Sequence, residues 1–204
     1  ALIIEAVLGI AAGFYAGLKR GGIFDSTMLV LSLVVIAVPI FVFGFVMQLI
    51  FGVKLGIAPI VVGSDPSFAD LLVPAFVLGL VSFAYVLRLT RTAVVENLTA
   101  DHVRTARAKG LGEWTILRRH GVRNAMIPMA TVIALDLGQL IGGLIITERI
   151  FNYPGVGAYY IKHVFNGDLP ALMPFLVLLI ISVLVFNLLA DLSYAKLDPR
   201  IKLG

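Results

Sequence analysis

Long stretches with almost no charged residue constrain this chain more than any other feature of its sequence. Five segments carry at most one charge each: residues 1–18, 27–51, 71–87, 125–147 and 171–190. The two charges within them are Glu5 and Asp136. A helix that crosses the hydrocarbon core needs about 20 apolar residues. These segments therefore predict an all-α transmembrane fold, a polytopic helical bundle with five spans.

The composition agrees with a membrane protein and excludes some chemistry. The chain is 60% hydrophobic and only 14% charged, whereas soluble domains carry about 25% charged residues. Cysteine is absent, so neither a disulfide framework nor a thiolate metal site can form in these residues.

The basic residues predict the orientation. Thirteen of the 16 Lys and Arg residues lie in three regions, which are residues 19–26, 88–124 and 191–204. Alternating crossings place these regions on one side, and the positive-inside rule makes that side cytoplasmic. We therefore expect a cytoplasmic loop at 88–124, a cytoplasmic C-terminus, and external loops at 52–70 and 148–170. Ala1 is then external, which leads us to expect an earlier helix and about six spans in the full protein. The net charge of +4 reflects orientation, so no nucleic-acid partner is predicted.

Catalytic sequence motifs are missing from the chain. It contains no His-Glu-x-x-His, no Gly-x-Ser-x-Gly and no P-loop, and its three histidines are scattered. We therefore expect a non-catalytic protein that binds neither a cofactor nor a metal. If it pumps a solute, the energy comes from another subunit.

Polar and small residues inside the spans suggest what the bundle encloses. Asp136 and Gln139 are three positions apart and share a helix face. A central Asp costs roughly 2.5–3.5 kcal/mol on insertion scales, so this face should point inward or at a wet cavity. It is either a structural hydrogen-bond anchor or part of a translocation path. The glycines at 9, 13 and 17, and those at 138 and 142, permit close helix approach, either within the chain or at a subunit interface or pathway.

The basic stretch "DHVRTARAKGLGEWTILRRHGVRNAMIPM", residues 101–129, interrupts the apolar pattern. It could be an ordinary loop, a patch for lipid or nucleic acid, or a docking surface. Thr99 is a candidate N-cap for a short helix that Gly110 and Gly112 end. "EWTILRRH" predicts a second short helix that has Trp114 on one face.

Small residues in this stretch favour the docking interpretation. Ala106 and Gly110 are four positions apart, so a helix would place them on one face as a shallow dent flanked by Arg and Trp. A solvated loop needs no such order.

These residues resemble the cytoplasmic Glu-Ala-Ala loop of binding-protein-dependent ABC transporter permeases, the membrane subunits of type I importers. Arg104-Thr105-Ala106 stands in place of Glu-Ala-Ala, Gly110 matches the loop glycine, and Ile127-Pro128 resembles the terminal Leu-Pro. The stretches "ERIFNYPGVG" and "NLLADLSYAKLDPRIK" resemble the dipeptide, oligopeptide and nickel branch of that family, specifically its B-type subunit.

The resemblance implies a subunit of the bacterial cytoplasmic (inner) membrane that imports peptides or a related small solute. Its implied partners are two ABC ATPase subunits that use ATP and Mg, a second homologous permease, an external substrate-binding protein and the lipid bilayer. The implied ATPase-docking residues are Arg104, Thr105, Ala106, Lys109, Gly110, Leu111, Glu113, Trp114 and Pro128. The external loop is placed to meet the binding protein through Tyr153, Pro154, Gly155 and Gly157.

Two other functions compete with this one. A secondary transporter or channel would use Asp136 as an ion or proton site. A membrane scaffold would use the basic loop to hold anionic lipid, but Asp101 and Glu113 interrupt the basic cluster.

Overall fold

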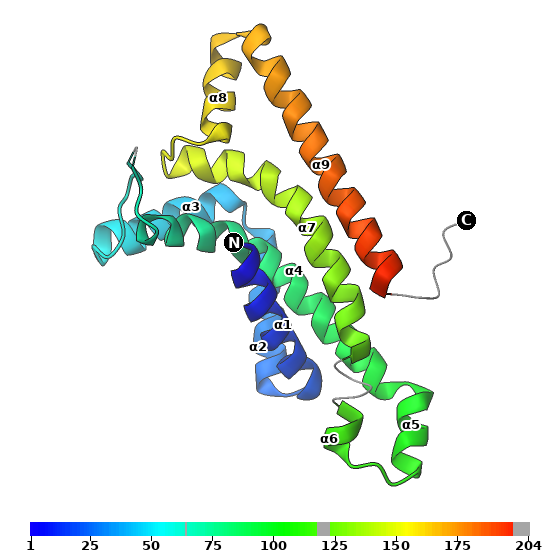
Figure 1. Cartoon of the computed structure of the whole chain (residues 1–204). Coiled ribbons are helices and arrows are strands. Elements are labelled where there is room, and N and C mark those ends of the chain that lie inside the picture. Colours follow the sequence, from blue (N-terminus) through cyan, green and yellow to red (C-terminus); the bar gives the residue numbers. More distant parts are fainter. Residues whose placement is uncertain (64, 118–122, 198–204) are drawn as a thin grey trace.

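A computed structural model of the chain describes residues 1–63, 65–117 and 123–197, and every regular element in them is a helix. The α-helices are α1 (Leu2–Leu18), α2 (Ile23–Ala37), α3 (Ile40–Met47), α4 (Leu72–Thr99), α5 (Asp101–Ala108), α6 (Glu113–Ile116), α7 (Arg123–Ile150), α8 (Val156–Asn166) and α9 (Leu169–Leu197). A π-helix, η1 (Gln48–Lys54), extends α3, and a 3-10 turn, η2 (Ala69–Leu71), precedes α4. The short helices α5 and α6 lie at one end of the molecule and α8 lies at the other (Figure 1). The predicted all-α fold is confirmed.

Helix α1 packs closely along α4 through its three spaced glycines. A Cβ atom at Gly9 would meet Val86, and one at Gly17 would meet Val94. At Gly13 it would collide with the backbone carbonyl of Leu87. Because successive turns of α1 meet successive turns of α4, the two helices run in the same direction. These glycines therefore serve packing within the chain.

The second apolar segment, 27–51, is not one straight helix. Helix α2 ends at Ala37, and the axes of Ile23–Ala37 and Ile40–Lys54 differ by 102°. Pro39 explains the break, because proline lacks an N–H group and disfavours the helical conformation at the residue before it. Val38 is accordingly extended, with ψ 128°. Beyond the break, α3 packs against α4 and α7.

Helix boundaries near the basic stretch differ from those expected. Helix α4 continues to Thr99, so the first 12 residues of the predicted loop 88–124 are helical. The predicted N-cap role of Thr99 is wrong. Its hydroxyl donates to the carbonyl groups of Val95 and Glu96 within α4, and Ala100 precedes α5 instead. Because the chain turns only at Ala100, α5 follows almost without a linker.

Two described helices are long and apolar enough to cross a membrane, Ala69–Thr99 and Leu169–Leu189. The bent pair α2 and α3–η1 makes a third if it counts as one span, and α1 is shorter at 17 residues. Helix α7 covers the predicted span 125–147. Only 6% of the apolar stretch of α9 is buried inside the chain. The surface of α9 is therefore available to lipid or to another subunit.

A small core holds the end of the molecule that carries α8. Val62, Val77 and Phe151 are fully buried against one another. The side-chain amide of Gln48 donates to the carbonyl groups of Ile60 and Ile150, both at 2.8 Å. The segment after the bent pair is therefore fastened to the end of α7.

Candidate functional site

The α5–α6 hairpin, residues 101–117, projects from the end of α4 (Figure 1). Helix α5 ends at Ala108, and Gly110 adopts φ +77°, a left-handed conformation that glycine adopts without strain. The amide of Leu111 then donates to the carbonyl of Ala106 at 3.2 Å. Gly112 precedes α6 in an extended conformation. The predicted pair of short helices at a glycine elbow is present as far as Leu117.

The hairpin has its own small core and its own ion pair. Val103 and Ile116 are fully buried, and Ala106 packs with them at 6% exposure. Across the elbow, the Arg107 guanidinium donates to both carboxylate oxygens of Glu113, at 2.7 and 3.2 Å. This hydrogen bond holds the pKa of the Glu113 carboxyl below its usual range. The two short helices are therefore joined to each other by an apolar core and by an ion pair.

The expected dent between Ala106 and Gly110 does not form. Gly110 lies beyond the last residue of α5, so the two residues do not share a helix face. Ala106 is small because Ile116 covers it, while a Cβ at Gly110 would meet nothing within 4 Å.

The exposed surface of the hairpin is instead built from larger side chains. Trp114 is 73% exposed and Leu111 is 41% exposed. The other exposed members of the predicted docking set are Arg104, Thr105, Lys109, Gly110 and Glu113. The side chain of Pro128 lies outside the described residues. The apolar side chains that a partner could bury are thus Trp114 and Leu111.

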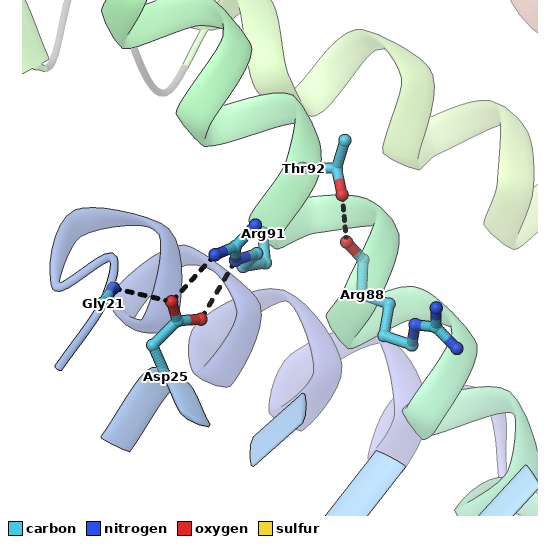
Figure 2. A network of polar contacts seen from close by, with 5 residues as sticks. All are labelled: Gly21, Asp25, Arg88, Arg91 and Thr92. Atoms are coloured by element: carbon cyan, nitrogen blue, oxygen red, sulfur yellow. Dashed lines mark hydrogen bonds and ion pairs between the residues drawn. The ribbon is translucent and has the colours of Figure 1, made fainter. Parts of the chain in front are cut away.

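An ion pair that the sequence analysis did not identify joins the start of α2 to α4. Arg91 donates to the two carboxylate oxygens of Asp25 at 2.9 and 2.8 Å, and the backbone N–H of Gly21 donates to the same carboxylate at 2.9 Å (Figure 2). The Asp25 side chain is only 3% exposed. Arg88, one turn away on α4, points its guanidinium elsewhere (Figure 2). The pairing connects positions 66 residues apart, and no local pattern indicates it.

Asp136 lies in the middle of α7, and Glu5 of α1 faces it. The Glu5 carboxyl lies close enough to interact with the Asp136 carboxyl and with the Ser82 hydroxyl. Glu5 is fully buried. Both of its carboxylate oxygens, and Oδ2 of Asp136, lack a well-aligned hydrogen bond from any described residue. Asp136 also lines a cavity of about 350 Å³ between α2, α4 and α7.

The predicted inward orientation of Asp136 agrees with this placement. The side chain of Gln139, its expected neighbour on the same face, lies outside the described residues. Glu5 lies only four residues into the first apolar segment, and the sequence alone indicates no partner for it. Its burial opposite Asp136 depends on how α1 and α7 pack.

The side chain of Glu148 holds the stretch around α8 in place. The carboxylate of Glu148 accepts hydrogen bonds from the backbone amides of Gly157 and Ala158, at 2.7 and 3.1 Å, at the N-terminus of α8. Amides at a helix N-terminus favour such a negative group. A Cβ at Gly155 would overlap that carboxylate, and one at Gly157 would strike the backbone of Ile145. The glycines therefore allow α8 to lie against α7.

The predicted binding-protein contacts divide between the interior and the surface. Gly157 is buried, while Tyr153 and Gly155 are half-buried and Pro154 is exposed. Pro154 and Gly155 line an open groove of about 770 Å³ along α8, together with Arg149, Tyr159, Lys162 and Phe165. Phe165 is 82% exposed. The surface available to a partner is thus α8 itself, next to the Pro-Gly turn.

Known proteins resemble this chain over almost its whole length. A family described as "Binding-protein-dependent transport system inner membrane component" matches residues 9–203. The dipeptide transport system permease protein DppB of Escherichia coli (strain K12) is 34% identical over 231 residues, which cover 99% of this chain and 68% of that protein. A putative peptide permease protein of Brucella suis biovar 1 is 37% identical over 209 residues, covering 98% of this chain and 66% of that protein.

A solved structure supports the fold independently. The MetNI methionine ABC transporter in an inward-facing conformation contains a chain that matches with a TM-score of 0.72 at 17% identity. The match covers 97% of this chain and 91% of that one. The helical arrangement described above is therefore that of a type I importer permease. The chain belongs to the family of binding-protein-dependent transport system inner membrane components, as a multi-pass permease of an ABC importer that works with ATPase and substrate-binding partners.

Proposed function

We propose that this permease passes peptides, or a related small solute, into the cell by alternating access. The observation that carries the proposal is the set of peptide-transport names among relatives 34–37% identical over 98–99% of this chain. The energy comes from ATP and Mg used by partner ATPases, and the chain itself is non-catalytic and binds no cofactor.

The α5–α6 hairpin is the proposed docking element for an ATPase subunit. Its internal core and the Arg107–Glu113 ion pair make it a compact unit. A displacement of the hairpin would therefore be transmitted to α4 through the short link at Ala100. Trp114 and Leu111 supply the exposed apolar area that a groove in the partner would bury. Movement of the hairpin would then rotate the long helices as rigid bodies between two openings.

The remaining assignments follow from this arrangement. The region 88–124 and the C-terminus are cytoplasmic, and the groove along α8 is external, where it meets the substrate-binding protein. A second, homologous permease completes the pathway, and the exposed apolar face of α9 is available to it and to lipid. Asp136 and Gln139 line the path.

Affinity purification of the full-length protein in mild detergent tests the proposal. We expect two ATPase subunits and a second permease to copurify, and a peptide-loaded binding protein to stimulate ATP hydrolysis in proteoliposomes. Solute uptake driven by an ion gradient without ATP would contradict the proposal. Stimulation by another class of solute, with none by peptides, would retain the importer and overturn the peptide assignment.

A further inference from the structure

Glu5 and Asp136 form a pair of carboxyl groups that takes no part in the proposed docking of the ATPase or of the substrate-binding protein. Like charges at close range oppose each other, so a cation beside the two carboxyl groups would stabilise negative charge on them. Among the described residues, neither carboxylate forms an ion pair with a Lys, Arg or His side chain.

Negative charge on a buried carboxyl group that has no ion-pair partner is unfavourable, because the group has lost its hydration. Glu5 and its two unsatisfied oxygens are fully buried, and Glu5 does not line the cavity between α2, α4 and α7. Asp136 lies on the wall of that cavity. A cationic ligand in that cavity would supply the missing partner.

The cavity wall matches one kind of cation. Asp136, Ser82 and Tyr85 each contribute an oxygen-bearing side chain, while Ile36, Val132 and Leu135 are apolar. A primary ammonium group has three N–H donors, and carboxylate and hydroxyl oxygens are suitable acceptors for them. Magnesium and calcium require six or more oxygen ligands, and no group of three or more metal-binding side chains occurs among the described residues.

We infer that Asp136, supported from behind by Glu5, binds the protonated amino group of the solute in this cavity. The inference deepens the proposed import function and rests on it for the solute class. Glu5 is a positioning residue, because it does not line the cavity, whereas Asp136 contacts the ligand.

The test measures binding without the substrate-binding protein, whose own selectivity would otherwise intervene. The full-length chain, assembled with its partner subunits in nanodiscs, is equilibrated with radiolabelled alanyl-alanine and with the N-acetylated form. We expect the free amine to bind at least about ten-fold more tightly, because hydrogen bonds to a charged group are strong. Equal binding of the two compounds would overturn the inference.

Near-isosteric variants assign the contact. Asp136→Asn should abolish the preference for the free amine. Glu5→Gln should reduce the preference without abolishing it, because Glu5 supports Asp136 but only Asp136 lines the cavity. Glu96→Gln, at an exposed position of α4, is the matched control and should retain the full preference. A preference that survives in Asp136→Asn would contradict the assignment.

Two further arms separate the alternatives. Stronger competition by sodium chloride than by methylammonium chloride at equal ionic strength would identify an inorganic cation as the occupant and overturn the inference. ATP-driven uptake with the binding protein present reports on the proposed function alone. Normal uptake without an amine preference would reject the subsite and keep the importer. An amine preference without ATP-driven uptake would keep the subsite and reject the importer.

Discussion

Gly13 and Gly142 are both interior glycines of long helices, but their surroundings differ completely. A Cβ at Gly13 would strike the Leu87 carbonyl and the Thr90 side chain, while one at Gly142 would meet nothing within 4 Å. The gain in helix propensity from Gly to Ala is about 1 kcal/mol at either site. Only the packing of α1 on α4 distinguishes them.

Gly13→Ala should therefore destabilise the protein, by about 1–3 kcal/mol for overpacking. Gly142→Ala should leave stability unchanged or raise it. Thermal unfolding of the purified full-length protein in detergent measures both. Equal midpoints for the two variants would contradict the close α1–α4 contact.

The two arginines one turn apart on α4 offer a second matched comparison. Arg91→Gln removes the partner of the buried Asp25 carboxylate, whereas the Arg88 guanidinium points away from it (Figure 2). Because Arg91 is 21% exposed, we expect a cost between those of surface and buried pairs, about 2 kcal/mol. Arg88→Gln should change stability by less than about 0.5 kcal/mol. A comparable loss in unfolding midpoint for both variants would show that the pair is not stabilising.

At the scale of elements, the α5–α6 hairpin combines an internal core with an exposed apolar surface. Its buried residues hold the two short helices together, so the exposed Trp114 contributes little to the hairpin's own structure. Buried aromatic side chains commonly dominate interfaces. Trp114 is accordingly the residue with which to separate docking from folding.

Trp114→Ala should reduce copurification of the ATPase subunits and peptide-stimulated ATP hydrolysis at least about ten-fold, as expected for an interface residue worth 1.4 kcal/mol or more. Phe68→Ala, at an 81% exposed residue before η2, is the control and should leave copurification intact. Full ATPase recovery with Trp114→Ala would remove the hairpin surface from the docking site.

The Arg107–Glu113 ion pair should stiffen the same element. Arg107→Glu places two carboxylates together and should increase hydrogen exchange across residues 103–116, and adding Glu113→Arg should restore protection. The lowered pKa of Glu113 means that the contact is present at neutral pH and is lost as the pH falls through that pKa. Unchanged exchange in the single variant would show that the hydrophobic cluster alone holds the hairpin.

At the scale of the whole molecule, the α5–α6 hairpin and α8 lie at opposite ends of the long helices (Figure 1). This separation allows one end to meet an ATPase while the other meets a binding protein. It also makes the proposed orientation directly measurable, because these 204 residues contain no cysteine.

Single cysteines at Lys109 and at Phe165, both exposed, should therefore differ in accessibility. In spheroplasts, a membrane-impermeant thiol reagent should label Phe165→Cys and should label Lys109→Cys only after permeabilisation. The reverse pattern would invert the topology. Labelling of both in intact spheroplasts would place the two ends on one side.

The sequence alone determined the helical class, the five apolar segments, the glycine elbow and the family, since each depends on composition or on residues close together in the chain. The break at Pro39 has a local cause in the sequence, although the apolar run around it predicted one continuous span. Only the tertiary structure decided that Glu5 faces Asp136 and that Asp25 binds Arg91. The physical reason is that apolar periodicity states how much of a helix is buried but not which helix covers it. Partners distant in the sequence are chosen by close packing, as where the α1 glycines bring α1 against α4.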